Sequence, residues 1–189
     1  MASFTLTGFL LATLGAASGF DGDWVRLLGA ALLIAAGTFC QSMMAMTTKT
    51  FGKVVATSIR MLDNVLDVTH WPLEQQLKEA QAKRRVGLGY TGLGDALIML
   101  GLRYDTPEAR EEGRKISEYM RNRAYLASSD LAKERGAFPL FNADMYLSGG
   151  NFASRLPADV KDKIRKQGIR NSHLLSIAPT GTISLAFAD

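Results

Sequence analysis

The uneven distribution of charge along the chain constrains its fold more than any other feature. Of the 189 residues, the first 50 carry only four charged side chains: Asp21, Asp23, Arg26 and Lys49. Residues 51–189 carry the other 20 Lys and Arg and the other 16 Asp and Glu. A segment with so few charges must be buried in protein or in lipid. We therefore divide the chain into a hydrophobic N-terminal segment, 1–50, and a charged domain, 51–189.

The N-terminal segment contains two uncharged stretches, residues 1–20 and 27–48. Each is as long as the roughly 20 residues that a membrane-spanning helix needs, so a membrane hairpin is one interpretation. No basic residue precedes the first stretch, which disfavours both a membrane anchor and a secretory signal. A buried pair of helices rich in Ala and Gly is the interpretation that we favour, so residues 1–48 are not expected in a membrane.

Composition excludes several kinds of site. The single cysteine, Cys40, rules out an internal disulfide and a Cys-rich zinc site, and we expect it to be a small buried hydrophobe. The two histidines, His70 and His173, lie far apart in the sequence, so no metal site is expected. The net charge of +4 is not concentrated in a basic stripe with interleaved aromatic residues, so no nucleic-acid partner is expected.

From Phe51 onward the pattern is that of an amphipathic helix. Apolar residues recur at steps of three and four, at Val55, Ile59, Leu62 and Leu66. We expect Lys53, Arg60 and Asp63 on the opposite, solvated side of this helix. The helix should end before His70-Trp71-Pro72, because the residue before a proline is pushed out of the helical conformation.

A second, long helix should begin at Thr106-Pro107, since Thr106 can cap it and proline suits the first helical position. Gly136 should end it. Its buried face is predicted at Ala109, Gly113, Ile116, Met120, Ala124, Ala127 and Leu131. Shorter helices are expected over residues 72–84, 93–100 and 157–167, and loops over 138–141 and 147–150.

Gly87, Gly89 and Gly92 spell G-x-G-x-x-G, the dinucleotide-binding pattern. That pattern is meaningful only between a buried strand and a helix. The residues before it, 78–85, have the composition of a charged helix, and the acidic partner would fall at the start of another helix. A nicotinamide-dependent dehydrogenase is therefore not expected. We interpret the glycines as part of a short strand on which helix 93–100 packs closely.

The end of the chain has the pattern strand, turn, helix. Leu174–Ile177 is long enough for one buried strand, residues 178–182 form a Gly/Thr turn, and Ile183 resumes as a helix. Such a turn can present backbone N–H groups to a phosphate that is attached to a larger molecule. An ordinary N-capped helix fits the pattern equally well. The turn lacks the lysine of a Walker loop, so hydrolysis of a nucleoside triphosphate is not implied.

Residues 176–184, Ser-Ile-Ala-Pro-Thr-Gly-Thr-Ile-Ser, resemble the substrate-phosphate loop of the ribonucleotide reductase large subunit. Residues 60–67, 84–95 and 135–139 are similar to the same family in the same order, and most similar to its adenosylcobalamin-dependent class II branch. The resemblance implies an α/β, helix-rich fold over residues 51–189 that is a fragment of the family's ten-stranded α/β barrel.

The resemblance also implies a chemistry, namely reduction of a ribonucleotide to a 2′-deoxyribonucleotide through a cysteine thiyl radical. It implies adenosylcobalamin as cofactor, a thioredoxin-like thiol system as reductant and a cytoplasmic location. The phosphate-binding residues that it implies are Pro179, Thr180, Gly181, Thr182 and Ile183.

The chain departs from the family at the centre of that chemistry. The Asn-Pro-Cys-Gly-Glu loop that carries the radical cysteine is absent, one cysteine cannot supply the redox pair, and Cys40 lacks the required neighbours. We assign no catalytic residue, metal ligand or corrin ligand. Residues 2–9 resemble the family segment after the second redox cysteine, so we expect a fragment that keeps the phosphate loop and is inactive alone. The alternative is a membrane-anchored, non-catalytic binding module built on the same fragment.

Overall fold

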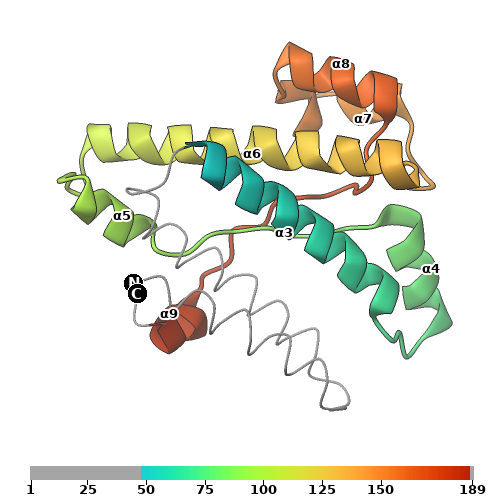
Figure 1. Ribbon diagram of the computed structural model, residues 1–189, viewed down its shortest axis with the longest axis horizontal. Coiled ribbons are helices and arrows are strands. Elements are labelled where there is room, and N and C mark those ends of the chain that lie inside the picture. The colour runs from blue at the N-terminus through green and yellow to red at the C-terminus, as the bar shows by residue number, and fades with distance from the viewer. Residues whose placement is uncertain (1–47, 188–189) are drawn as a thin grey trace. The chain divides into compact units, whose positions relative to one another are not determined.

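The computed structural model describes residues 48–187 (Figure 1). The two uncharged stretches, apart from Thr48, and Cys40 lie outside the described residues, so the predictions made for them stay predictions. The described part is helix-rich, and its elements are α3 (Thr48–Val68), α4 (Glu74–Lys83), α5 (Leu93–Met99), α6 (Pro107–Arg135), α7 (Ala143–Leu147), the 3₁₀ helix η2 (Ala153–Arg155), α8 (Ala158–Gln167) and α9 (Gly181–Phe187). None of the helices in this part is long and apolar enough to cross a membrane.

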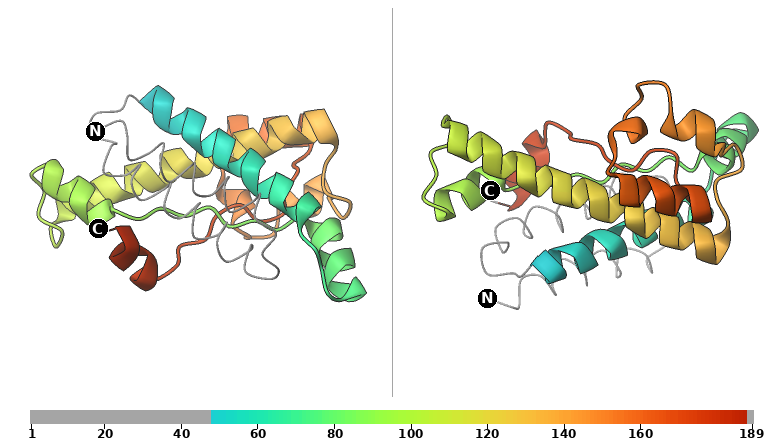
Figure 2. Two further views of the ribbon diagram at one scale, coloured as in Figure 1. Left: turned by 60° about the horizontal axis from the view of Figure 1, so that its bottom comes forward. Right: turned by 90° about the horizontal axis from the view of Figure 1, so that it is seen from above.

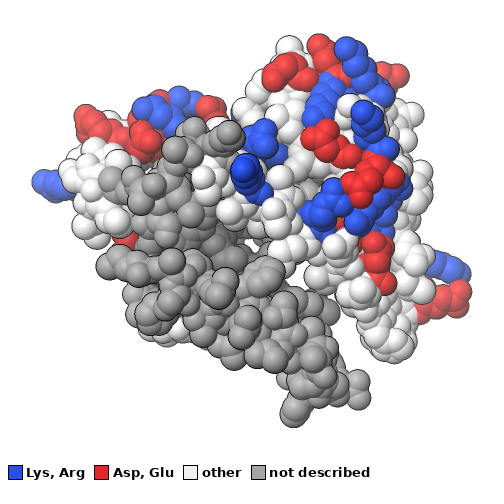
Figure 3. All heavy atoms as spheres, in the orientation of Figure 1, with Lys and Arg blue, Asp and Glu red and all other residues white. Residues whose placement is uncertain are grey.

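The described residues form two compact units. Unit 1 contains residues 48–51, 88–114 and 176–187, and unit 2 contains residues 52–87 and 115–175. Figure 3 shows that Lys and Arg are interspersed with Asp and Glu on the visible face, without a large area of a single sign.

Helix α3 confirms the predicted apolar stripe, with one exception. Val55 and Ile59 are buried, while Lys53 and Arg60 are exposed, as expected. Asp63 is fully buried, so its predicted place on the solvated side is wrong. The physical reason is its spacing, because a residue four positions after Ile59 lies on the same face of a helix. The helix ends at Val68, before His70-Trp71-Pro72 as predicted.

Helix α6 begins and ends where local signals predicted. The Ala109 amide donates to Thr106 Oγ1 at 3.3 Å, which confirms Thr106 as a cap. Gly136 follows the last helical residue with φ +87°, a conformation that favours glycine. The predicted apolar face is buried at Ala109, Ile116, Met120, Ala124 and Leu131.

In unit 2, α8 lies along the C-terminal half of α6 (Figure 2). Lys163 of α8 pairs with Asp130 of α6 at 2.7 Å. Between these helices in the chain, α7 was not predicted from the sequence. It begins with a cap that could have been recognised, since Asn142 Oδ1 accepts a hydrogen bond from the Met145 amide at 3.0 Å. Residues 138–141 form the predicted loop, and Phe138, Phe141 and Tyr146 make edge-to-face contacts with one another.

The two predicted strands, the one before Gly92 and the one at Leu174–Ile177, are wrong for the part of the chain that is described, because it contains no strand. Leu88 and Leu175 are isolated bridge positions. In unit 2 the Ser172 amide donates to Lys83 O at 3.1 Å and the Val86 amide to His173 O at 3.0 Å, so the two segments run in the same direction. Parallel pairs form lasting ladders only within larger, covered sheets. The ten-stranded barrel is accordingly not shown by the described residues.

The contact between α3 and α6 in unit 2 predicts how the substitution of Gly52 by alanine affects stability. A Cβ atom on Gly52 would lie 2.8 Å from Arg123 Nε and 2.9 Å from Tyr119 Oη. We expect Gly52→Ala to lower the free energy of unfolding by about 1–3 kcal/mol, because the side chains of Arg123 and Tyr119 must leave their positions. This loss would appear although helix propensity alone favours alanine by about 1 kcal/mol.

Urea unfolding of Gly52→Ala and of Gly94→Ala measures this effect. A Cβ atom at Gly94, in α5, would meet nothing within 4 Å, so this control should be as stable as the wild type or slightly more stable. Equal stability of the Gly52→Ala variant and the wild type would show that the close approach of α3 and α6 is incorrect.

Candidate functional site

The predicted phosphate-binding residues lie in unit 1, at a bend that leads into α9. Residues 176–180 are not helical, and α9 begins at Gly181, earlier than the predicted start at Ile183. Pro179, Gly181 and Thr182 are exposed, and Thr180 and Ile183 are half-buried. The predicted residues therefore span the start of a helix, with Pro179 and Thr180 before α9 and the other three in its first turn, and three of the five are exposed.

The backbone of this bend is unusual at one residue. Thr180 has φ +57°, in the left-handed region that a β-branched residue rarely adopts. Thr180 and Gly181 both already have an interaction partner, so an anion bound here would add to existing contacts or replace them. Next to them, Thr182 is exposed on the first turn of α9, so its hydroxyl group can donate a hydrogen bond to a ligand.

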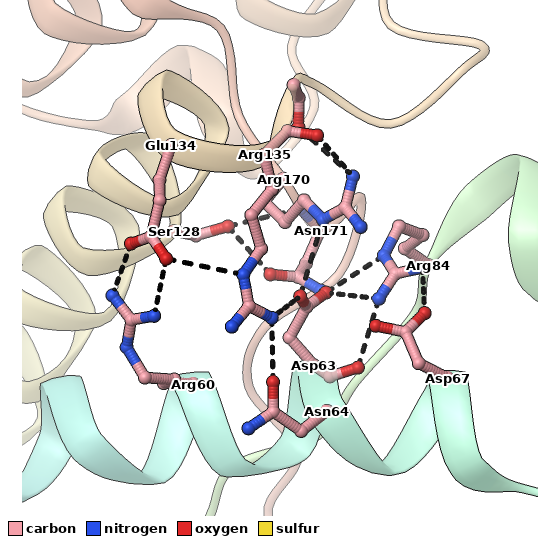
Figure 4. A network of polar contacts seen from close by, with 11 residues as sticks. Arg60, Asp63, Asn64, Asp67, Arg84, Ser128, Glu134, Arg135, Arg170 and Asn171 are labelled. Atoms are coloured by element: carbon pink, nitrogen blue, oxygen red, sulfur yellow. Dashed lines mark hydrogen bonds and ion pairs between the residues drawn. The ribbon is translucent and has the colours of Figure 1, made fainter.

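Unit 2 contains a second polar site that sequence reasoning did not predict, centred on the buried Asp63 (Figure 4). Arg84 Nε donates to Asp63 Oδ1 at 2.8 Å, and Asn171 Nδ2 donates to the same oxygen at 2.9 Å. Arg135 Nη1 and Arg170 Nε approach Asp63 Oδ2 at 3.4 and 3.3 Å. We call this group the Asp63 cluster; its members are Asp63, Asp67, Arg84, Ser128, Arg135, Arg170 and Asn171.

Arg84 is the most fully bonded cation of the cluster. Besides Asp63 Oδ1, its guanidinium donates to the Asp63 carbonyl at 3.0 Å and to Asp67 Oδ1 at 2.8 Å. Burial lowers the pKa of Arg84, but its hydrogen bonds to Asp67 and Asp63 outweigh this, so the pKa is raised overall. The hydrogen bond from Arg84 lowers the pKa of Asp67 below its ordinary value. These contacts hold Arg84 although its φ of +44° is unfavourable for a residue other than glycine.

Asn171 joins the cluster to α6. Ser128 Oγ donates to Asn171 Oδ1 at 2.9 Å, and the Asn171 amide donates back to Ser128 Oγ at 3.1 Å. Both side chains are fully buried, and each makes a reciprocal hydrogen bond, as buried polar groups must. No motif indicated Asn171, because its role arises from contacts between residues far apart in the chain.

The Asp63 cluster is built to hold chain segments together and not to perform proton transfer. Its carboxylate is fully buried and its two oxygens face three guanidinium groups and one amide, so no position beside it remains for a reacting ligand. At its edge, Arg60 binds Glu134 through two hydrogen bonds of 2.9 and 2.6 Å. These bonds lower the pKa of Glu134 from 4.5 to about 2.

A pocket of about 420 Å³ also lies in unit 2, beside the segment from Ser172 to Leu175. Its walls include Tyr125, Tyr146 and Phe152. Tyr146 Oη donates to the Ser172 carbonyl at 3.0 Å. Burial raises the pKa of both tyrosines, so each phenol serves as a hydrogen-bond donor and not as a base. Among the described residues, His, Cys, Asp and Glu side chains form no group that could hold a metal ion.

Comparison with known proteins gives matches that all point to one family. The family described as "Ribonucleotide reductase, barrel domain" matches residues 30–189. The chain is 36% identical over 133 residues to a vitamin B12-dependent ribonucleoside-diphosphate reductase of Mycobacterium tuberculosis, a match that covers 70% of this chain and 17% of that protein. A protein of the same name from Thermoplasma acidophilum is 36% identical over 135 residues, covering 70% and 15%.

A ribonucleoside-diphosphate reductase large subunit of Arabidopsis thaliana is 31% identical over 141 residues, covering 70% of this chain and 17% of that protein. The chain thus spans about a sixth of the length of the curated relatives that it matches.

The burial of Asp63 predicts that substituting two neighbouring arginines by alanine lowers stability by unequal amounts. Arg84 is 5% exposed and bonded to Asp63, whereas Arg85 is exposed. We expect Arg84→Ala to lower the free energy of unfolding by about 3 kcal/mol, because it removes the main partner of a buried charge. Arg85→Ala should change it by no more than about 0.5 kcal/mol. Chemical denaturation measures both, and equal losses would show that Asp63 does not depend on Arg84.

The low pKa of Glu134 predicts a pH dependence of stability. A carboxyl group whose pKa falls on folding stabilises the protein above its unfolded pKa, and this contribution is lost as the pH falls. For Glu134 the loss should occur between pH 4.5 and about 2. Unfolding measured at several pH values should show that the wild type is more stable than Glu134→Gln at pH 6, with the difference shrinking toward pH 2.

Arg60→Ala provides the control for this measurement. In that background the main partner of Glu134 is missing and only the weaker contact with Arg135 remains, so adding Glu134→Gln should change the pH dependence much less than it does in the wild type. A difference between wild type and Glu134→Gln that stays constant across this pH range would contradict the prediction.

Proposed function

Because this chain belongs to the family of the ribonucleotide reductase barrel domain, we propose that it is part of the catalytic barrel of an enzyme that reduces ribonucleotides to 2′-deoxyribonucleotides. The observation that carries this proposal is the family match over residues 30–189. The names of the relatives support it, since the Mycobacterium, Thermoplasma and Arabidopsis proteins are all ribonucleoside-diphosphate reductases. We keep as part of the proposal a ten-stranded α/β barrel, with a domain boundary near residue 50.

Within this enzyme, the contribution of the described residues is to hold the phosphate groups of the substrate. We assign this role to Pro179, Thr180, Gly181, Thr182 and Ile183. Pro179 and Thr180 lie directly before α9, and Gly181, Thr182 and Ile183 form its first turn; this position, with three of the five residues exposed, supports the assignment. At such a bend, backbone N–H groups and threonine hydroxyls can donate hydrogen bonds to phosphate oxygens, while the reacting ribose is held elsewhere. The radical cysteine loop is absent from this sequence, so binding and not turnover is the activity to measure on this chain.

We place the enzyme in the adenosylcobalamin-dependent class II branch, located in the cytoplasm and served by a thioredoxin-like thiol reductant. The Mycobacterium and Thermoplasma relatives support this branch by name, whereas the Arabidopsis relative does not carry that name. Adenosylcobalamin would supply the radical. The pocket in unit 2, with about 420 Å³, is smaller than a corrin with its nucleotide arm, so the residues that line it do not fit the cofactor. We therefore assign no step through the cofactor to these residues.

The phosphate assignment predicts that a negative charge at the bend weakens binding of ADP. We expect Thr182→Glu to weaken the affinity for ADP about tenfold, because a carboxylate beside the bound phosphates repels them. The substitution should not disturb folding, since Thr182 is exposed and acidic residues are favourable in the first turn of a helix. Isothermal titration of the 189-residue chain with ADP measures the change.

Ala186→Glu is the matched control, because it adds the same charge to an exposed position one turn further along α9. It should weaken the affinity for ADP clearly less than Thr182→Glu does, since the added charge lies about 6 Å further along the helix and repulsion falls with distance. Wild-type affinity in the Thr182→Glu variant would refute the loop assignment, and absence of ADP binding by the wild-type chain would refute the proposed function for this chain.

A further inference from the structure

The Asp63 cluster contains more charge than stability alone requires. Buried ion pairs are often no more stabilising than apolar residues of similar size, because removing the charges from water is costly. Here one carboxylate oxygen receives hydrogen bonds from both Arg84 and Asn171, which are 87 residues apart in the sequence. A shared acceptor of this kind fixes the position of two separate chain segments relative to each other.

Each of these donors stands at the start of an extended segment. Arg84 follows the last residue of α4 and precedes residues 85–88, and Asn171 precedes residues 172–176. The Ser172 amide donates to Lys83 O and the Val86 amide to His173 O in unit 2, and the Ser176 amide donates to Leu88 O in unit 1. The pairing therefore begins directly at the two residues that bind Asp63 Oδ1.

The residues next to Asn171 are fixed by α6 as well. The Arg170 amide donates to Ser128 O at 3.1 Å. Arg170 Nη1 donates to the carbonyls of Arg135 and Gly136 at 3.1 and 3.2 Å, at the C-terminal end of α6. The start of segment 172–176 is thus held by side-chain and backbone bonds to both α3 and α6.

No turn joins the two segments, so nothing local sets their register. In a parallel pair, a shift of one residue turns every side chain of a segment to the opposite face. Such a shift would separate either Arg84 or Asn171 from Asp63 Oδ1 and leave a buried polar group unpaired, which is strongly unfavourable. The Asp63 cluster therefore allows one register.

Segment 172–176 continues directly into the bend at Pro179–Ile183. We propose that Asp63 is a positioning residue for the segment that leads to this bend: by binding Arg84 and Asn171 it sets the register of segments 85–88 and 172–176, from which the chain continues to the residues that hold phosphate. This inference rests on the proposed function of the bend. Asp63 itself touches no substrate and acts through Asn171 and the segment that follows it.

The test combines amide hydrogen exchange with titration of ADP, on the whole chain. In Asp63→Asn, the amides of Ser172 and Val86 should exchange at least tenfold faster relative to the Gly168 amide at the end of α8, which bonds to Ile164 O. The affinity for ADP should fall at least fivefold at a temperature where the variant is folded. Glu134→Gln removes the same charge from an exposed carboxylate that pairs with Arg60 and approaches Arg135 but does not touch Asp63, Arg84 or Asn171, and it should change neither readout.

Arg84→Lys serves as a second, milder variant should Asp63→Asn fail to fold. A lysine keeps the charge but cannot bond to Asp63 Oδ1, the Asp63 carbonyl and Asp67 together, so the same two changes are expected. A merely structural role would speed exchange equally at Ser172, Val86 and Gly168 and leave the ADP affinity of the folded variant at the level of Glu134→Gln. That result would overturn the proposal, whereas a wild-type chain that binds no ADP would overturn the proposed function on which it rests.

Discussion

The buried carboxylate of Asp63 is the constraint on which the arrangement of unit 2 depends. A charge enclosed in protein is tolerable only when donors surround it, and here the donors come from the end of α4, the end of α6 and the segment after α8. Each of these elements must therefore reach the same point on α3. Val55 and Ile59 are buried on the same helix, and the cluster selects one arrangement among those that apolar packing alone would permit.

Local signals in the sequence were sufficient for most helices of the described part, with α7 and η2 as exceptions. A cap at Thr106 and a glycine at 136 define α6, because both act within one turn of the helix end. The prediction of strands was wrong because local patterns do not decide whether segments 85–88 and 172–176 form a ladder, which depends on residues far apart in the chain. The buried position of Asp63 was predictable from its spacing to Ile59, but a rule that charged residues face solvent concealed it.

The motif resemblance and the observed contacts concern different residues. The resemblance names residues 179–183 from their sequence, whereas the contacts explain how the preceding segment can be held in one register. Residues 60–67 and 84–95, which carry the resemblance upstream, contain Asp63, Asp67 and Arg84. A motif that looks unrelated to phosphate binding is thus accounted for as the support of the segment that leads to the bend.

The backbone conformation at Thr180 and Gly181 bears on the function of the bend. In the described part, Arg84 and Thr180 are the residues other than glycine with positive φ, and at Arg84 the contacts with Asp63 and Asp67 offset the cost. At the bend, the sequence places threonine in the left-handed conformation and glycine at the first residue of α9. The reverse order would be easier for the backbone by roughly 1 kcal/mol. A hydroxyl-bearing residue kept in a strained position is typical of a loop shaped to meet a ligand.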